Sequence, residues 1–240
     1  MLKIEGLTKV YGDKKAVDNL DLHIQKGEIY GFIGHNGAGK TTTIKACCGI
    51  LDFDQGNIYV DGINIKKDPL GCKSKIAYIP DNPDLYNFMT GIQYLNFIAD
   101  IFQISKEIRK ERIEKYAQMF EIQKDLASYI STYSHGMKQK LAIISALVHD
   151  PKLIIMDEPF VGLDPKASFQ LKNLMKEMCL KGSSIFFSTH VLEVAEKLCD
   201  RVGIINNGKL AFVGTLDEMK AQFNENTSLE KLFLEITENG

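Results

Sequence analysis

The chain has 240 residues, 45% of them hydrophobic and 25% charged, which is typical of a globular protein with one sizeable core. Its net charge of -2 at pH 7 offers no basic surface to nucleic acid, so we expect no nucleic-acid partner. The apolar runs are shorter than the roughly 20 residues that span a bilayer, and no signal-peptide stretch is present, so we expect a cytoplasmic protein. The five cysteines lack C-x-x-C spacing, which indicates reduced packing residues rather than a disulfide or a metal site.

Short β-type runs separated by turn signals occupy residues 1–65. They predict antiparallel strands around one apolar strand, Ile29–Ile33. The next helical pattern, Lys40–Cys48, ends at Gly49, a residue type that commonly terminates helices. A strand, a glycine-rich turn and a helix are therefore predicted over residues 29–49.

The stretch between this strand and this helix fits the pattern G-x-x-x-x-G-K-[ST] of a phosphate-binding loop, in which His35 occupies a variable position. Small residues allow backbone N–H groups to close around phosphate oxygens, Lys40 adds a positive charge, and the Thr41 hydroxyl suits a magnesium ion. The positive N-terminal end of the helix favours the same anion. The residues predicted to bind the nucleotide phosphates are Asn36, Gly37, Ala38, Gly39, Lys40, Thr41 and Thr42.

From Thr90 to His149 the pattern is helical, with a capping box at Thr90 and Gln93 and a cap at Ser105. After Pro151, strands and helices alternate, which implies a parallel sheet covered on both faces. The predicted strands are Leu153–Met156, Ser184–Ser188, Arg201–Ile205 and Lys209–Val213. The predicted helices are residues 165–182, with apolar Phe169, Leu174, Met175 and Met178, then Val191–Leu198, and two short helices in residues 215–235, the first capped by Thr215 and Glu218.

The apolar strand Leu153–Met156 ends in two acids, Asp157 and Glu158. A parallel strand delivers such carboxylates to the C-terminal edge of its sheet, where a phosphate-binding loop also lies. Asp157 would orient magnesium, directly or through water, and Glu158 would polarise the attacking water as a general base. Since phosphoryl transfer needs mainly the positioning of water, metal and charge, the acids and the loop together predict this chemistry.

Several independent motifs follow one another along the chain. They are Tyr11, the phosphate-binding loop, Ile79-Pro80-Asp81, Tyr133-Ser134-His135-Gly136-Met137, the acids Asp157 and Glu158, Gly162-Leu163-Asp164, and Ser188-Thr189-His190. In this order, and along nearly its whole length, the chain resembles the ATP-binding subunit of ABC transporters. The resemblance implies an α/β fold, with a P-loop NTPase (RecA-like) core, an antiparallel β subdomain and an α-helical insertion.

The resemblance also implies roles for these motifs. Tyr11 would stack on adenine, and His190 would contact the γ-phosphate and act with Lys40 and Glu158 in catalysis. ATP and Mg²⁺ are the implied ligands, with Thr41, Asp157 and Asp81 placed at the metal. The signature loop, Ser134, His135, Gly136 and Met137, would bind the ATP held by an opposite subunit, because Ser134 and Gly136 open a helix whose N–H groups can donate to a phosphate oxygen.

Two positions depart from the pattern of the family. Asp81 replaces the usual glutamine, so a shorter, charged group would reach the metal only through a water molecule. The rate of hydrolysis and the coupling to the membrane subunit at this position are therefore open questions. Met137 replaces the last glutamine of the signature. The run that includes Met137, together with the C-terminal run Ser228–Leu234, resembles bacterial exporters of the drug- and bacitracin-resistance type.

The expected organisation is a single ABC ATPase domain over residues 1–240. Within it, residues 1–83 and 150–214 would form the RecA-like core with the antiparallel β subdomain. Residues 84–149 would form the helical subdomain, and residues 215–240 the C-terminal helices. Coupling to a membrane partner would run through the Asp81 loop and the apolar side chains of Leu85, Tyr86 and Phe88.

The expected function is ATP hydrolysis that drives transport, with export favoured, through a membrane-spanning permease subunit and a second nucleotide-binding domain, identical or different. The protein would then lie on the inner face of the cell membrane. One alternative is a soluble ABC-type ATPase acting on the ribosome or DNA, although such relatives usually carry two nucleotide domains or a coiled coil, and neither lies between Thr41 and Ser134. Another is a weakly hydrolysing regulatory subunit, which Asp81 leaves open. A GTPase is disfavoured because no N/T-K-x-D segment is present.

Overall fold

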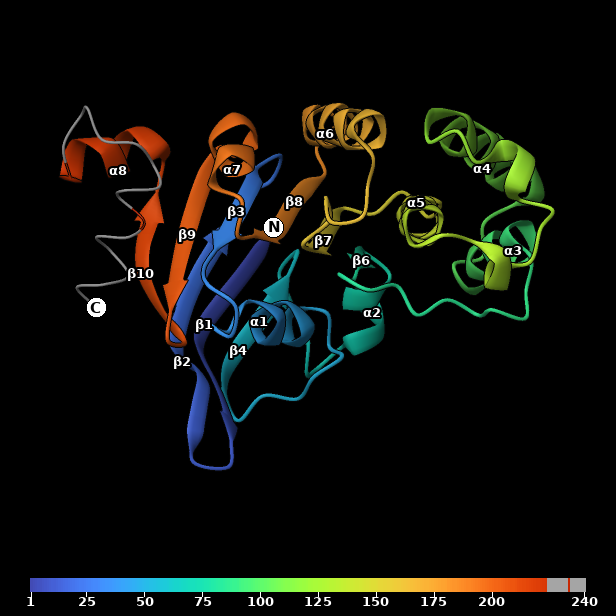
Figure 1. The fold of residues 1–240 in the computed structure, drawn as a ribbon. Coiled ribbons are helices and arrows are strands. Elements are labelled where there is room, and N and C mark those ends of the chain that lie inside the picture. The colour runs from blue at the N-terminus through green and yellow to red at the C-terminus, as the bar shows by residue number, and fades with distance from the viewer. Residues whose placement is uncertain (224–232, 234–240) are drawn as a thin grey trace.

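The computed structural model describes residues 1–223 and Phe233. Two β-sheets form the centre, helices cover them, and a group of helices extends to one side (Figure 1). This arrangement confirms the α/β class and the P-loop NTPase core with an antiparallel sheet and a helical insertion. Within the described residues, none of the helices combines the length and the apolar character that a membrane span requires.

The larger sheet carries the strand that leads into the phosphate-binding loop. Its strands, in spatial order, are β10 (Lys209–Gly214), β9 (Arg201–Asn206), β3 (Ile29–Ile33), β8 (Ser184–Thr189), β7 (Leu153–Asp157) and β6 (Ile76–Ile79). All neighbouring strands are parallel except the β9–β10 hairpin. The carboxyl ends of β3, β7 and β8 therefore meet at one edge of the sheet.

The smaller sheet is antiparallel. Its spatial order is β2 (Lys14–Ile24), β1 (Leu2–Tyr11), β4 (Gln55–Val60) and β5 (Ile63–Asn64). The sequence predicted these antiparallel strands correctly but placed them around Ile29–Ile33, whereas β3 pairs with β8 and β9 in the other sheet. Local turn signals show where a strand ends but carry no information on which distant strand it pairs with.

Side chains of the parallel strands alternate between two layers of the core. On β7, Ile154 and Met156 pack on one face while Leu153 and Ile155 pack on the other. The first layer includes α6 (Pro165–Leu180) and the helical insertion, and the second includes α1 (Lys40–Cys47) and the antiparallel sheet. Burial of both faces explains why these strands read as continuous apolar runs.

The predicted helix ends are largely confirmed. α1 is followed by Gly49 at φ +61°, and α3 (Gly91–Ile101) begins with the Thr90–Gln93 capping box. α4 (Lys106–Met119) begins after Ser105. Further helices are α5 (His135–Leu147), α7 (Leu192–Leu198) and α8 (Leu216–Phe223). The last of these begins with the predicted Thr215–Glu218 box.

Three features differ from the sequence prediction or lie beyond it. Phe169 is 61% exposed, because the buried face of α6 follows the helical spacing of Ala167, Leu171, Leu174, Met175 and Met178. Strand β6 and the short helix α2 (Pro69–Lys73) were not predicted. The second C-terminal helix and the run Ser228–Leu234, Phe233 apart, lie outside the described residues, and the predicted subdomain limits stay a prediction.

A histidine ring lies where the helical insertion meets the core. His149 follows α5, its Nε2 lies 3.1 Å from the carbonyl oxygen of Ile76, and its ring stacks on Phe102 at 3.7 Å. Burial lowers the pKa of His149 to about 4, with Arg112 adding to the effect, while the contact with Ile76 and the nearby Asp150 act in the opposite direction. The neutral imidazole is therefore the form that fits this junction.

We expect this histidine to make the protein sensitive to acid. The folded-state pKa lies below the value of about 6.5 for an unfolded chain, so the unfolded state binds more protons between pH 6.5 and 4, and stability falls as the pH is lowered through this window. The loss from pH 7 to pH 5 should be about 2 kcal/mol. Urea unfolding of the wild type and of His149→Gln at both pH values measures it; equal losses in the two proteins would contradict the assignment.

Candidate active site

The phosphate-binding loop is wedged between two neighbouring backbones. A Cβ atom at Gly34 would lie 2.6 Å from the carbonyl oxygen of Ile205, and one at Gly39, where φ is +114°, would lie 2.5 Å from that of Ala16. The N–H group of Gly208 also donates to the carbonyl oxygen of Ala38 at 2.9 Å. Only glycine fits these two positions, and the close packing holds the loop at the sheet edge.

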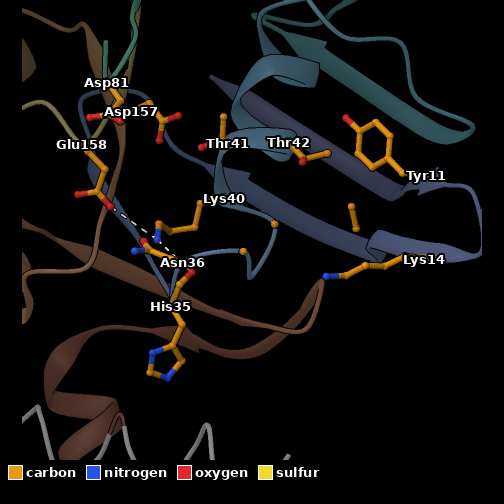
Figure 2. A pocket seen from close by; sticks show the side chains of 13 residues that line it. Tyr11, Lys14, His35, Asn36, Lys40, Thr41, Thr42, Asp81, Asp157 and Glu158 are labelled. Atoms are coloured by element: carbon orange, nitrogen blue, oxygen red, sulfur yellow. Dashed lines mark hydrogen bonds and ion pairs between the residues drawn. The ribbon is translucent and has the colours of Figure 1, made fainter.

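Lys40, the first residue of α1, reaches back across this loop. Its side chain is nearly buried, and Nζ donates to the carbonyl oxygens of Gly34 at 2.6 Å and His35 at 3.2 Å. The same Nζ lies 3.6 Å from Oε1 of Glu158, as the dashed line in Figure 2 marks. The structure thus brings the predicted lysine and the predicted general base together.

A buried serine fixes both acids at the end of β7. Asp157 is 2% exposed and its Oδ1 accepts a hydrogen bond from the hydroxyl of Ser188 on β8. The backbone N–H of Glu158 donates to the oxygen of the same hydroxyl at 3.0 Å. One side chain therefore fixes the Asp157 carboxylate relative to the backbone of Glu158.

Glu158 adopts a backbone conformation that is unusual for its residue type. Its φ is +47°, in the left-handed region, which costs roughly 1–3 kcal/mol for a residue with a side chain. This turn directs the carboxylate towards Lys40, and Nδ1 of His190 lies 3.0 Å from Oε1 of Glu158. Among the described residues, the buried Oε1 has no hydrogen bond of good geometry, although both nitrogen atoms lie close to it.

A cleft of about 400 Å³ opens in front of these groups, a size suited to a small-molecule ligand (Figure 2). Tyr11, 49% exposed at the end of β1, lies at the opposite side of the cleft from Glu158. Asp81 and Asp157 both line the cleft. The cleft is lined by Tyr11, Lys14, Ala16, His35, Asn36, Gly37, Gly39, Lys40, Thr41, Thr42, Asp81, Asp157 and Glu158. Of the predicted phosphate-binding residues, only Ala38 does not line it.

The signature loop does not line the cleft of its own chain. Ser134 caps α5 by accepting a hydrogen bond from the N–H of Met137 at 3.3 Å. The loop instead contacts the Gly162-Leu163-Asp164 turn: a Cβ at Gly136 would lie 2.8 Å from the carbonyl oxygen of Gly162, and one at Gly162 would overlap the His135 ring. The signature helix and this turn therefore form one packed unit.

An ion pair reinforces that unit. Lys140 on α5 lies 2.7 Å from Asp164, which also caps α6 by accepting from the N–H of Ala167. The hydrogen bond from Lys140, followed by that from Ala167, lowers the pKa of Asp164. Asp164 thus stays ionised at neutral pH and ties the start of α6 to α5.

Sequence reasoning gave no role to two residues of this site. The sequence motif with His190 includes Ser188, but its bridge between the two acidic residues was not predicted. The available signal was a serine that follows apolar residues of a buried strand, since a buried hydroxyl needs a hydrogen-bond partner. Lys14, at the start of β2, lines the cleft and extends towards it in Figure 2. Nothing in the local pattern distinguishes this lysine from other exposed ones.

The fold and the site define a class of protein. A glycine-rich loop between a strand and a helix, facing a carboxylate pair at the same sheet edge, is the arrangement of P-loop nucleoside triphosphatases. Residues 17–161 match the ABC transporter family. The chain belongs to this family and is an ATP-binding, ATP-hydrolysing subunit of an ABC transporter.

Similarity to known proteins extends over almost the whole chain. The ABC-type transporter ATP-binding protein EcsA of Bacillus subtilis (strain 168) is 37% identical over 238 residues, which cover 99% of this chain and 96% of that protein. The bacitracin transport ATP-binding protein BcrA of Bacillus licheniformis is 37% identical over 221 residues, covering 92% of this chain and 71% of that protein.

Solved structures show the same fold. The ATP-binding subunit of an ABC transporter superposes with a TM-score of 0.94 at 35% identity, covering 98% of this chain and 99% of that one. A dimeric structure of MJ0796, described as a bacterial ABC transporter cassette, gives a TM-score of 0.83 at 25% identity, covering 90% and 99%.

The contact between Gly162 and His135 generates a stability prediction. Gly162→Ala combines a positive φ of +79° with an overlap on the His135 ring, so we expect a loss of roughly 3 kcal/mol in the free energy of unfolding. In a His135→Gly background the overlap is absent and about 1 kcal/mol should remain, from backbone strain alone. Chemical unfolding of the four proteins measures both values. Additive losses would show that the two residues do not press on each other.

Proposed function

We propose that this chain powers export by binding MgATP in the cleft and hydrolysing it with Glu158 as the general base. The observation that carries the proposal is the convergence of Lys40 and His190 on one oxygen of Glu158, at 3.6 and 3.0 Å, beside the phosphate-binding loop. These groups come from three different parts of the chain. An ion pair with a purely structural role would not need to lie next to a glycine-rich loop.

The loop and α1 would hold the phosphates of ATP. Gly37, at φ +80°, has open space where a Cβ would stand, so a phosphate group can approach its backbone closely. The N–H groups at the start of α1 point to the same side, and Lys40 would exchange its bonds to the carbonyl oxygens of Gly34 and His35 for phosphate oxygens. Tyr11 would stack on the adenine ring, with Lys14 near the sugar and phosphates.

Glu158 would accept the proton of the attacking water. Its side chain lines the cleft, Oε1 has no hydrogen bond of good geometry within the described residues, and the hydroxyl of Ser188 holds its backbone at the edge of the sheet that carries the phosphate loop. His190, half-exposed beside the same oxygen, would donate to the γ-phosphate. Departure of that phosphate would leave the imidazole with Glu158 as its partner, which gives the site a way to report hydrolysis.

The oxygen ligands at the cleft fit magnesium. Asp157, Asp81 and the hydroxyl of Thr41 line one wall, and carboxylate and hydroxyl oxygens are the ligands that Mg²⁺ takes in nucleotide sites. When bound, the ion would neutralise charge on the β- and γ-phosphate oxygens. Ser188 orients the Asp157 carboxylate for this purpose by donating its hydroxyl hydrogen to Oδ1.

A second nucleotide-binding domain would complete the site. Ser134, His135, Gly136 and Met137 lie at the start of α5, away from the cleft of their own chain. The N–H groups of this first turn, apart from that of Met137, which Ser134 caps, would be available to a nucleotide bound elsewhere. A head-to-tail dimer, with an identical or a different partner, would place them on the opposite ATP. The dimeric assembly of MJ0796 supports this arrangement.

Relatives named for bacitracin transport and linearmycin resistance support export as the direction of transport. The substrate would then pass through a separate permease, and this subunit would bind to it at the inner face of the membrane. The same names disfavour action on the ribosome or DNA, and the Lys40–Glu158–His190 arrangement disfavours a weakly hydrolysing regulatory subunit.

An aromatic surface on the helical insertion, formed by Tyr86, Phe88, Tyr94 and Phe97, would receive the permease. Phe88 is 74% exposed, and the ring of Tyr86 contacts those of the other three at 5.7 to 6.0 Å. Beside it runs a groove of about 340 Å³ lined from both the core and the insertion. Exposed aromatic rings grouped in this way mark a surface that another protein covers.

We expect Glu158→Gln to bind ATP as the wild type does but to hydrolyse it at least about 100-fold more slowly, because the amide cannot take up a proton. Phosphate release and nucleotide titration measure the two effects, and light scattering should show a dimer that persists with ATP. Lys40→Ala is the matched control, since it should lose binding itself. Undiminished turnover in Glu158→Gln would remove Glu158 as the base.

We expect Phe88→Ser to abolish co-purification with a membrane protein from the native host. The ring is 74% exposed, so folding should be retained while the aromatic surface loses its most accessible member. Leu180→Ser, 88% exposed on α6, is the control and should retain the partner. Equal recovery of the membrane protein with both variants would place the docking surface elsewhere.

A further inference from the structure

The phosphate-binding loop has a contact on the side away from the cleft. The ring of His35 points away from Lys40 and the cleft in Figure 2 and lies 4.8 Å from the ring of Phe233, tilted by 55°. These residues are almost 200 positions apart in the sequence. Aromatic pairs at such separations attract each other beyond the effect of burial.

Phe233 is anchored in its own part of the core. It is 8% exposed and packs in a cluster with Ile33, Ile204 and Met219, to which Ala195 and Val202 also belong. Ile33 is the last residue of β3 and directly precedes the loop. Phe233 therefore packs against both the strand that enters the loop and the loop's second residue.

The backbone of His35 in turn supports the rest of the loop. Its carbonyl oxygen accepts from the N–H of Ala38 and from Nζ of Lys40, both at 3.2 Å. A displacement of His35 therefore moves the acceptor that holds the catalytic lysine. The imidazole points away from the cleft, and its ring contact with Phe233 links the loop to the cluster that contains Phe233.

We propose that Phe233 is a positioning residue for nucleotide binding, and that it acts through His35 to hold the phosphate-binding loop in the shape that receives ATP. The proposal rests on nucleotide binding at this loop. The coupling is reciprocal. If the packed ring of Phe233 strengthens nucleotide binding, bound nucleotide favours the packed position of this ring by the same factor. The packing of Phe233, far from the loop in the sequence, thereby affects the affinity for nucleotide.

The test is a titration of the full chain with a fluorescent ADP analogue, followed by steady-state hydrolysis. Phe233→Ala should raise the dissociation constant and the KM for ATP about three- to tenfold, the range of one aromatic contact, while kcat stays within about twofold. Phe233→Tyr keeps the ring and should restore affinity. Phe233→Leu fills the cluster without a ring and should remain weak, so it decides the matter if Phe233→Ala fails to fold.

A matched control separates the contact from the general packing of the cluster. Phe212 packs against the same cluster, and the contact that places a ring on His35 is made by Phe233. Phe212→Ala should therefore leave the dissociation constant within about twofold of the wild type. An equal weakening in Phe212→Ala would overturn the proposal, because loss of cluster packing alone would then explain the effect.

A double-mutant cycle tests the route through His35. His35→Ala should weaken binding about as much as Phe233→Ala, and the double variant should be no weaker than either single one. Additive losses would overturn the proposal, as would unchanged affinity in a folded Phe233→Ala protein. A wild type that binds no nucleotide would instead refute the function proposed for the site, so the two failures are distinguishable.

Discussion

The hydroxyl of Ser188 is the interaction on which the geometry of the site depends. It joins β8 to the end of β7 by donating to Asp157 and accepting from the backbone N–H of Glu158, so the Asp157 carboxylate and the Glu158 backbone are held by one oxygen atom. The strained backbone of Glu158 is maintained by these neighbours. Because the group is buried, loss of the hydroxyl would leave an unpaired carboxylate in the interior, which is far more costly than one lost surface bond.

Much of the site could be predicted because its chemistry depends on short, contiguous segments. The phosphate-binding loop, the acids at the end of an apolar strand and His190 after another apolar strand each sit at the carboxyl end of a parallel strand. Strand ends of a parallel sheet share one edge, so the sequence indicates proximity without any knowledge of strand order. The structure brings Lys40, Glu158 and His190 together as this reasoning requires.

What could not be predicted depends on pairing between distant segments. The assignment of β3 to the parallel sheet, the bridging role of Ser188 and the approach of Lys14 to the cleft all arise from which strands become neighbours. The exposure of Phe169 could not be read from its residue type, because the buried face of its helix runs through Leu171 and Leu174. No local sequence pattern around either residue predicts the contact between the rings of Phe233 and His35.

One hydrogen bond has a consequence for how the two halves of a transporter would communicate. Lys138, in the first turn of the signature helix, donates to the side chain of Asn87 at 2.9 Å, between the aromatic residues Tyr86 and Phe88. This bond links the aromatic surface proposed for the permease directly to the helix end proposed for the opposite subunit. In the proposed assembly, each permease half would sense the ATP carried by the far subunit rather than by the one attached to it.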